Sequence, residues 1–179
     1  MRLRLAYYPD PILRKKADRV NIIDDSLRQL VNDMVETMHA NRGIGLAAPQ
    51  IHYSLSIFVS CVPIQGAGGK WHQGQNRVFI NPIILSSSDD IQLSEEGCLS
   101  IPHIAVNVKR PVSIQIQAID LLGKTFEETL TGLHAANFLH ELDHLNGVLT
   151  VDYLTDNQRR EIEPQLEDLK RKFHNPHQK

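Results

Sequence analysis

The feature that most constrains this chain is a pair of histidines four residues apart within a strongly apolar helical segment. Residues 132–146 distribute apolar side chains around most of the helix circumference, which is typical of a helix in a protein interior. On such a helix His140 and His144 lie about 40° apart around the axis and about 6 Å apart along it, so both imidazoles can reach one metal ion. Two unrelated histidines on a polar face are disfavoured, because they would be buried without partners. The apolar positions are Leu133, Ala136, Phe138, Leu142 and Leu145.

Glu141 and Cys98 complete the predicted metal site. Glu141 lies about 100° from His140 around the helix, so it cannot easily bind the same ion but can reach a water attached to it and carry its protons. Two histidines need at least one further protein ligand, and a thiolate suits a transition metal. Cys98 is the best candidate, because Gly97 before it permits an unusual backbone turn. Cys61 lies in an apolar segment and is expected to be an inert buried thiol.

Two further helices are predicted on either side of a β-rich middle. Residues 24–41 have apolar side chains at helical spacing, with Asp24 or Asp25 available as N-cap and Gly43 as terminator. A last helix is expected over about 156–173, with Pro164 starting a new turn or introducing a kink. We therefore expect one catalytic domain over residues 1–179 that ends in this helix.

Strands are predicted in the middle of the chain. Apolar or alternating segments indicate strands at residues 55–62, 77–80 and 112–118. The glycine-rich residues 65–75 favour a flexible surface loop, and no helical pattern follows them as a nucleotide-binding loop would require. The fold class predicted is α+β, with largely antiparallel sheets packed around a central metal-binding helix.

Composition excludes several functional classes. The chain has 179 residues, 41% hydrophobic and 22% charged, with a formal net charge of −2. It has no long apolar run for a membrane span and no secretory signal, so we expect a cytoplasmic protein in a reducing compartment. Sequence-specific nucleic-acid binding is not expected, because it needs a clustered basic face. The one basic run, Lys170 to Lys172, is explained by a solvated helix end.

Three separated segments together resemble the peptide deformylase family. They read Gly43-Ile-Gly-Leu-Ala-Ala-Pro-Gln50, Glu96-Gly-Cys-Leu-Ser100 and His140-Glu-Leu-Asp-His144, the last a His-Glu-X-X-His motif. Their order and spacing match the family, and the resemblance extends from Tyr8 to about Thr155. It implies an enzyme of protein biosynthesis that removes the N-terminal formyl group from formylmethionyl nascent chains and releases formate, a step of N-terminal methionine processing.

The resemblance also implies roles for individual residues. A metal-bound water would attack the formyl carbon while Glu141 takes its proton and later gives it to the departing amine. The metal, the side-chain amide of Gln50 and the backbone N–H of Leu99 would hold the developing oxyanion. Substrate-binding positions are Ile44, Gly45 and Gly97. Glu96 and Arg110 would form an ion pair that supports the Cys98 loop.

Ferrous iron is the metal that the resemblance implies. A set of one cysteine and two histidines is also a good zinc site, and another divalent transition metal is an open alternative. Formylmethionyl nascent peptides are the implied partners, whereas ribosome docking and oligomeric state are left open.

This chain departs from the family pattern at two places. Leu139 stands where family members usually have Gln, and Ala105 stands where they usually have Arg. Without that Arg, a charged donor to the substrate backbone beyond methionine is lost, so we expect a weaker demand on downstream residues. His103 and the glycine loop 66–74 are also expected to shape the substrate groove.

Two other functions have to be weighed. A structural metal module would need a fourth protein ligand, but His134 lies about 600° from His140 around the helix, on the opposite side. A zinc endopeptidase would share the His-Glu-X-X-His element, but the cysteine ligand and the Gln50 loop argue against it.

Overall fold

The structure is a computed structural model that describes residues 1–173, and it has the predicted α+β architecture. Every pairing between its named strands is antiparallel. A five-stranded sheet has the order β1-β2-β5-β8-β9, and β3-β4 and β6-β7 form two separate hairpins. The strands are β1 (Gly45–Ala47), β2 (Ile57–Ser60), β3 (Ile64–Gln65), β4 (Trp71–His72), β5 (Arg77–Ser87), β6 (Ile91–Cys98), β7 (Ile101–Pro111), β8 (Ser113–Ile119) and β9 (Thr125–Thr131).

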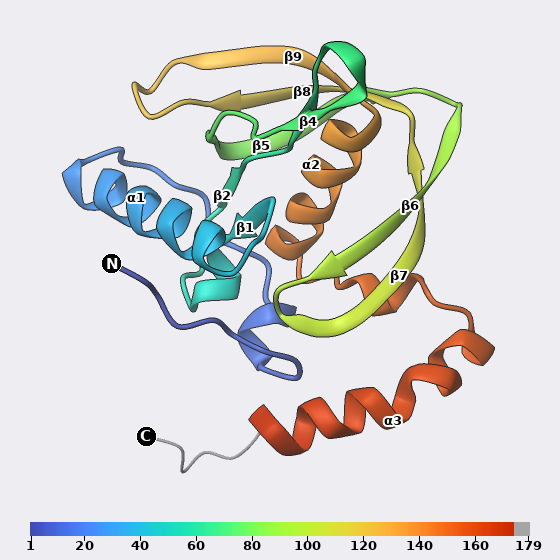
Figure 1. The fold of residues 1–179 in the computed structure, drawn as a ribbon. Coiled ribbons are helices and arrows are strands. Elements are labelled where there is room, and N and C mark those ends of the chain that lie inside the picture. The colour runs from blue at the N-terminus through green and yellow to red at the C-terminus, as the bar shows by residue number, and fades with distance from the viewer. Residues whose placement is uncertain (174–179) are drawn as a thin grey trace.

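Helix α2 (Gly132–Leu145) runs through the middle of the molecule, between the five-stranded sheet and the β6-β7 hairpin (Figure 1). It contacts strands of both. Its apolar side chains are buried except for Leu133 and Leu142, and Leu133 is 41% exposed. The prediction of a central helix between antiparallel sheets is therefore confirmed.

Helix α1 (Asp25–Ala40) packs on β1 and β2 and begins as predicted. The Asp24 carboxylate accepts a hydrogen bond from the Leu27 N–H at 2.9 Å, which satisfies one of the free donors at the helix start. The predicted terminator is wrong, because the left-handed residue is Arg42, with φ 58°, and not Gly43. The Gly43 N–H still closes the helix by donating to the Met38 carbonyl at 2.9 Å.

Helix α3 (Asp156–Phe173) crosses below the β6-β7 hairpin and contacts β7 (Figure 1). It is one continuous helix with Pro164 inside it. Leu166 and Leu169 are its buried residues. Short 3₁₀ helices occur at Pro11–Arg14, Ala48–Ile51, Ala67–Gly69 and Thr150–Tyr153.

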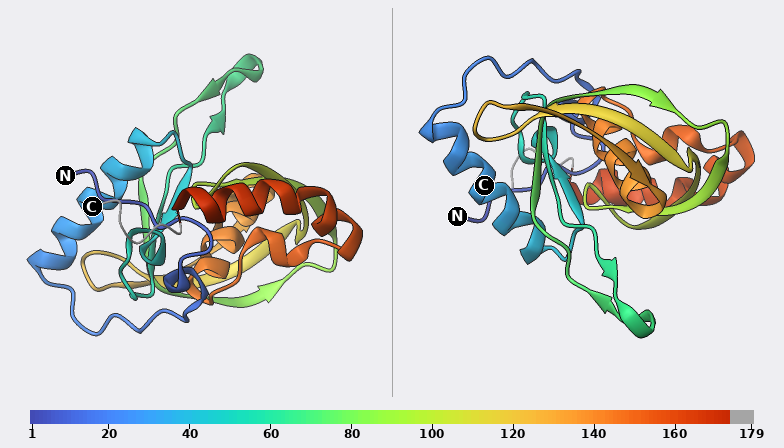
Figure 2. Two further views of the ribbon diagram at one scale, coloured as in Figure 1. Left: turned by 90° about the horizontal axis from the view of Figure 1, so that it is seen from below. Right: turned by 90° about the horizontal axis from the view of Figure 1, so that it is seen from above.

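The strand predictions were right in position and wrong in extent. In β8 the alternation is confirmed by the buried Ile114, Ile116 and Ala118, but Val112 lies outside the strand and is 37% exposed. Strand β5 continues past Pro82, where the register with β8 shifts because proline has no N–H for the ladder. The glycine loop is not irregular throughout, since β3 and β4 pair across it in a hairpin that projects from the body (Figure 2).

The hydrophobic core of the described residues contains three clusters. One joins α1 to β1 and β2, the second joins β7 to α3 and contains Cys98, and the third packs α2 on the large sheet around Phe58, Phe79 and Phe138. The candidate site borders all three clusters, since Leu99 packs against the first, Cys98 belongs to the second and Leu139 to the third. Within residues 1–173, no helix combines the length and apolar character needed to cross a membrane.

Candidate metal centre

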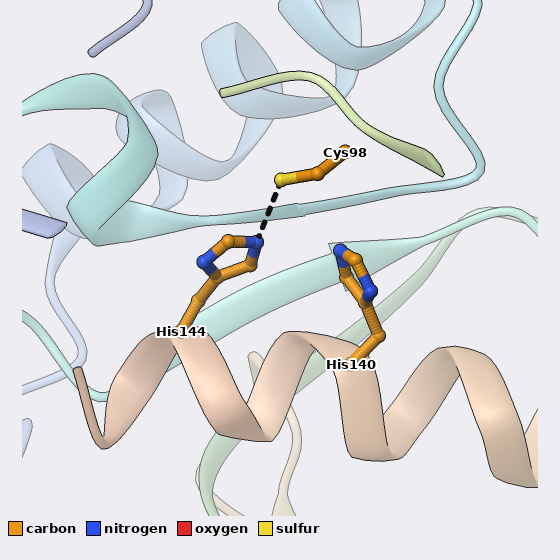
Figure 3. A group of neighbouring side chains, drawn as sticks. All are labelled: Cys98, His140 and His144. Carbon is orange, nitrogen blue, oxygen red and sulfur yellow. Dashed lines mark hydrogen bonds between the residues drawn. The ribbon is translucent and has the colours of Figure 1, made fainter. Parts of the chain in front are cut away.

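Cys98, His140 and His144 lie together as a buried group that can hold a metal ion. One ligand atom from each lies within 4.8 Å of the other two. The Cys98 sulfur is 3.2 Å from Nε2 of His144. Figure 3 shows the thiol approaching from the end of β6 and both rings rising from α2 toward it. His134 is not part of this group.

The chemistry of this group fits a transition metal. One thiolate and two imidazoles are the donors that divalent iron and zinc accept, and they come from two elements far apart in sequence. Burial would raise the pKa of Cys98, but the neighbouring His144 and His140 lower it well below the usual value for a thiol. Burial would lower the pKa of His140, but Cys98 and Glu96 raise it well above the usual value. The pocket thus favours a thiolate beside a positive charge, which a bound cation also provides.

A carboxylate fixes the orientation of His140. Nδ1 of His140 lies 2.9 Å from Oε2 of Glu96. When this nitrogen donates its hydrogen to the carboxylate, the lone pair of Nε2 is left for a metal. This contact therefore suits a neutral His140 that binds a metal through Nε2.

Glu96 is in turn held by Arg110, as the resemblance implied. The guanidinium donates from Nε to Oε1 at 2.8 Å and from Nη2 to Oε2 at 2.9 Å, and both residues are buried. Nη1 of Arg110 is paired with Asp143 at 2.8 Å and also donates to the Tyr153 hydroxyl. Burial would raise the pKa of Glu96, but Arg110 and His140 lower it to about 2. The carboxylate is therefore ionised at neutral pH.

Glu141 lies deep beside the ligands. It is 2% exposed, and its Oε2 has no hydrogen-bond partner within residues 1–173. Burial raises the pKa of Glu141 to about 7, although His140 and His144 lower it. A carboxyl group with a pKa near neutrality can both accept and return a proton.

Gln50 and Leu99, the residues expected to hold the oxyanion, both lie beside Cys98. The Gln50 Oε1 accepts from the Ala47 N–H at 2.8 Å, which directs its amide nitrogen toward Cys98. That Nε2 is 3.7 Å from the Cys98 sulfur and 3.2 Å from Oγ of Ser100. Leu99 is half-buried, next to the ligand, and lines the same cavity as Gln50.

A cavity of about 740 Å³ opens onto the centre. All of the predicted substrate positions line it, namely Ile44, Gly45 and Gly97, together with His103 and Ala105. The glycine loop does not, since none of residues 66–74 reaches this cavity. Gly97 has no left-handed φ, so the expected unusual turn is wrong; a register shift between Gly97 and Cys98 bends the strand instead.

The cavity also has walls that the sequence patterns did not point to. Tyr7 and Phe173 line it, and their rings stack with centroids 4.0 Å apart. Asn137 lines it from α2, one turn before Glu141. Tyr7 and Phe173 come from the two ends of the described chain, and Asn137 precedes the His-Glu-X-X-His motif. No local sequence motif links these three residues to the site.

The second cysteine stays apart from the centre. Cys61 is buried just after β2, and its thiol donates to the Gly74 carbonyl at 3.3 Å. Both cysteines are free. Cys61 is not in the group of ligands, in keeping with the inert role expected for it.

Fold and site define a class: an α+β domain with a buried cysteine and two histidines on an open cavity, and a carboxylate beside them. Residues 2–160 match the family model described as polypeptide deformylase. The chain therefore belongs to the peptide deformylase family, which is metal-dependent.

Relatives and solved structures agree with this assignment. A peptide deformylase of Pseudomonas aeruginosa is 42% identical over 165 residues, covering 92% of this chain and 94% of the relative. A chloroplastic and mitochondrial peptide deformylase of Arabidopsis thaliana is 40% identical over 96% of this chain, which spans only 61% of that relative. The crystal structure of a plant peptide deformylase superposes with a TM-score of 0.88, at 39% identity, covering 98% of this chain and 92% of the other. The crystal structure of a peptide deformylase from Legionella pneumophila superposes with a TM-score of 0.83, also at 39% identity, covering 98% of this chain and 99% of the other.

Proposed function

We propose that this chain is a peptide deformylase that hydrolyses the N-terminal formyl group of formylmethionyl nascent polypeptides and releases formate. The observation that carries the proposal is Glu141, buried beside three converging ligand atoms at the floor of an open cavity. Family membership supports the same activity.

Cys98, His140 and His144 would hold the metal, which we propose to be ferrous iron. When bound, such an ion supplies Lewis-acid polarisation of water and of the formyl carbonyl. Zinc suits the same donors. Iron beside a thiolate would make activity sensitive to oxygen, whereas zinc has no redox chemistry.

Glu141 moves the protons. Its carboxylate accepts a proton from the attacking water and later donates it to the nitrogen that leaves as a free α-amine. The buried position keeps bulk water from exchanging that proton during the reaction. The amide nitrogen of Gln50 and the backbone N–H of Leu99 stabilise the negative charge on the formyl oxygen.

The substrate backbone lies along β1. This strand is at the edge of the five-stranded sheet, so one side of its backbone can pair with an extended peptide. Gly45 begins this strand and Ile44 precedes it, and Gly97 near the end of β6 lines the same cavity. The Glu96–Arg110 pair orients His140.

The remaining assignments are also proposals. We propose one catalytic domain over residues 1–179, in the cytoplasm, acting on chains as they leave the ribosome. One hydrophobic cluster that joins residues from Ala6 to Leu169 supports a single domain.

Formate release by protein purified without oxygen tests the function. We expect release from a formyl-Met peptide, no cleavage within the peptide, and no reaction with the same peptide lacking formyl. Cleavage of internal bonds would support an endopeptidase, and metal binding without any turnover would support a structural module.

A further inference from the structure

Asn137 lies on the same face of α2 as Glu141. The two residues are four positions apart, so their side chains are neighbours on the helix. Asn137 is 7% exposed, and it lines the cavity together with Glu141. The chemistry proposed above gives this buried amide no role.

A strand residue fixes the orientation of the Asn137 amide. The Ser60 hydroxyl donates to Oδ1 of Asn137 at 2.7 Å, and both residues are buried. Because the amide oxygen is bound to β2, the amide nitrogen with its two N–H donors must point elsewhere. Ser60 is the cross-strand partner of Gly45, which places this nitrogen close to Gly45.

Gly45 leaves the room that brings the amide and the carboxylate together. A Cβ built on Gly45 would lie 2.8 Å from Nδ2 of Asn137 and 2.7 Å from Cδ of Glu141. Both groups therefore border the same small volume, which a side chain at position 45 would fill. Oε1 of Glu141 is the atom nearest to that position, and Oε2 has no hydrogen-bond partner within residues 1–173.

We propose that Asn137 is a positioning residue for the reaction, which directs its amide N–H groups at the Glu141 carboxylate and holds that carboxylate toward the reacting water. Ser60 sets the direction of the amide, and Gly45 keeps the space open. The inference rests on the proposed deformylase function. It assigns a role to a polar pair, Ser60 and Asn137, that is separated by 77 positions.

Kinetics of four variants test the proposal: Asn137→Leu, Ser60→Ala, the double variant, and Asn157→Leu as the control. Asn157 is exposed in the first turn of α3, so this control makes the same Asn-to-Leu change at a surface position. Each protein is purified without oxygen, its metal content and melting temperature are measured, and formate release is followed on a formyl-Met peptide.

Misplacing a reacting group by about 1 Å can cost about 100-fold in rate, so kcat of Asn137→Leu should fall about 10- to 100-fold. KM should change less than about 2-fold, and metal content should be unchanged. Ser60→Ala should lower kcat less, and the double variant should be no slower than Asn137→Leu, because both act through one amide.

Several results would overturn the proposal. The first is an unchanged kcat in Asn137→Leu. The second is a raised KM with a normal kcat, which would indicate that Asn137 contacts the substrate. The third is a double variant in which the effects of the two single changes multiply. Should Asn137→Leu fail to fold, Ser60→Ala decides, and an unchanged kcat there contradicts the role. A parent protein that releases no formate removes the proposed function itself, whereas an active parent with insensitive variants removes only the inference.

Discussion

Nδ1 of His140 lies 2.9 Å from Oε2 of Glu96, a carboxylate that a buried arginine holds through two hydrogen bonds. The contact links the β6-β7 hairpin to α2, because Glu96 lies on β6 and His140 on the helix. The contact therefore joins the His140 ring to β6, the strand that also carries Cys98. Metal affinity should therefore depend on residues that never touch the metal.

Glu96→Ala should weaken metal binding about 10- to 100-fold, because His140 loses the acceptor that fixes its tautomer and ring orientation. Titration with a metal chelator measures the change. Glu95→Ala is the matched control, since Glu95 is the exposed neighbour on the same strand. Equal affinity in the Glu96 and Glu95 variants would contradict the orienting role.

Cys98→Ala should be isolated with little metal, because two histidines alone leave the ion without its thiolate. Cys98→Ser should bind at least about ten-fold more weakly, or about 1.4 kcal/mol. Metal analysis of the purified proteins checks both. Cys61→Ala, which removes the other buried cysteine, should keep its full metal content.

Glu141→Ala should retain metal and lose about 100- to 10,000-fold in turnover, the usual contribution of a general acid or base. Retained metal with lost turnover identifies a proton carrier, because removal of a metal ligand would lower both the metal content and the turnover. Full activity in this variant would mean that some other group carries the proton.

Activity should fall on the acidic side of neutrality. Burial raises the pKa of Glu141 to about 7 from a usual value of 4.5, and the positive charge of a bound metal would lower it again. The ionised carboxylate is the form that accepts a proton, so kcat/KM should rise with pH and level off above this pKa. The acidic limb should have its midpoint between about 4.5 and about 7. A profile that falls with rising pH across that window would contradict the assignment.

Gly45→Ala should destabilise the fold by about 1–3 kcal/mol and reduce activity, because the new methyl group overlaps the side chains of Glu141 and Asn137. Gly97→Ala is the matched comparison, since a Cβ there meets nothing within 4 Å. Urea unfolding of the two variants should separate them clearly. Equal stabilities would show that the space beside Gly45 is not needed.

The metal ligands and the fold class could be predicted because local patterns encode them. A histidine pair at helical spacing in an apolar helix gives both the position of α2 and two ligands. The β6-β7 hairpin was not predicted, although burial alternates along β7 from Ile104 to Arg110. Ile91 and Leu93 are exposed in it, while Glu96 and Arg110 are buried as a pair. Such an inversion of polarity depends on tertiary contacts that a strand pattern does not contain.

The residues that line the cavity were harder to predict from the sequence than the metal ligands. Phe173 stacks on Tyr7 from the other end of the described chain, and Asn137 depends on Ser60 for its orientation. Neither relation is visible in the sequence, because both depend on tertiary contacts between residues that are distant along the chain.

X-ray absorption at the metal edge tests the central claim most directly, on protein purified without oxygen and loaded with one metal per chain. The account predicts one sulfur neighbour at about 2.3 Å, two nitrogen neighbours at about 2.0–2.1 Å for zinc, and at least one oxygen from solvent. The sulfur signal should disappear in Cys98→Ser. A first shell without sulfur, or one filled by four protein ligands, would contradict the account.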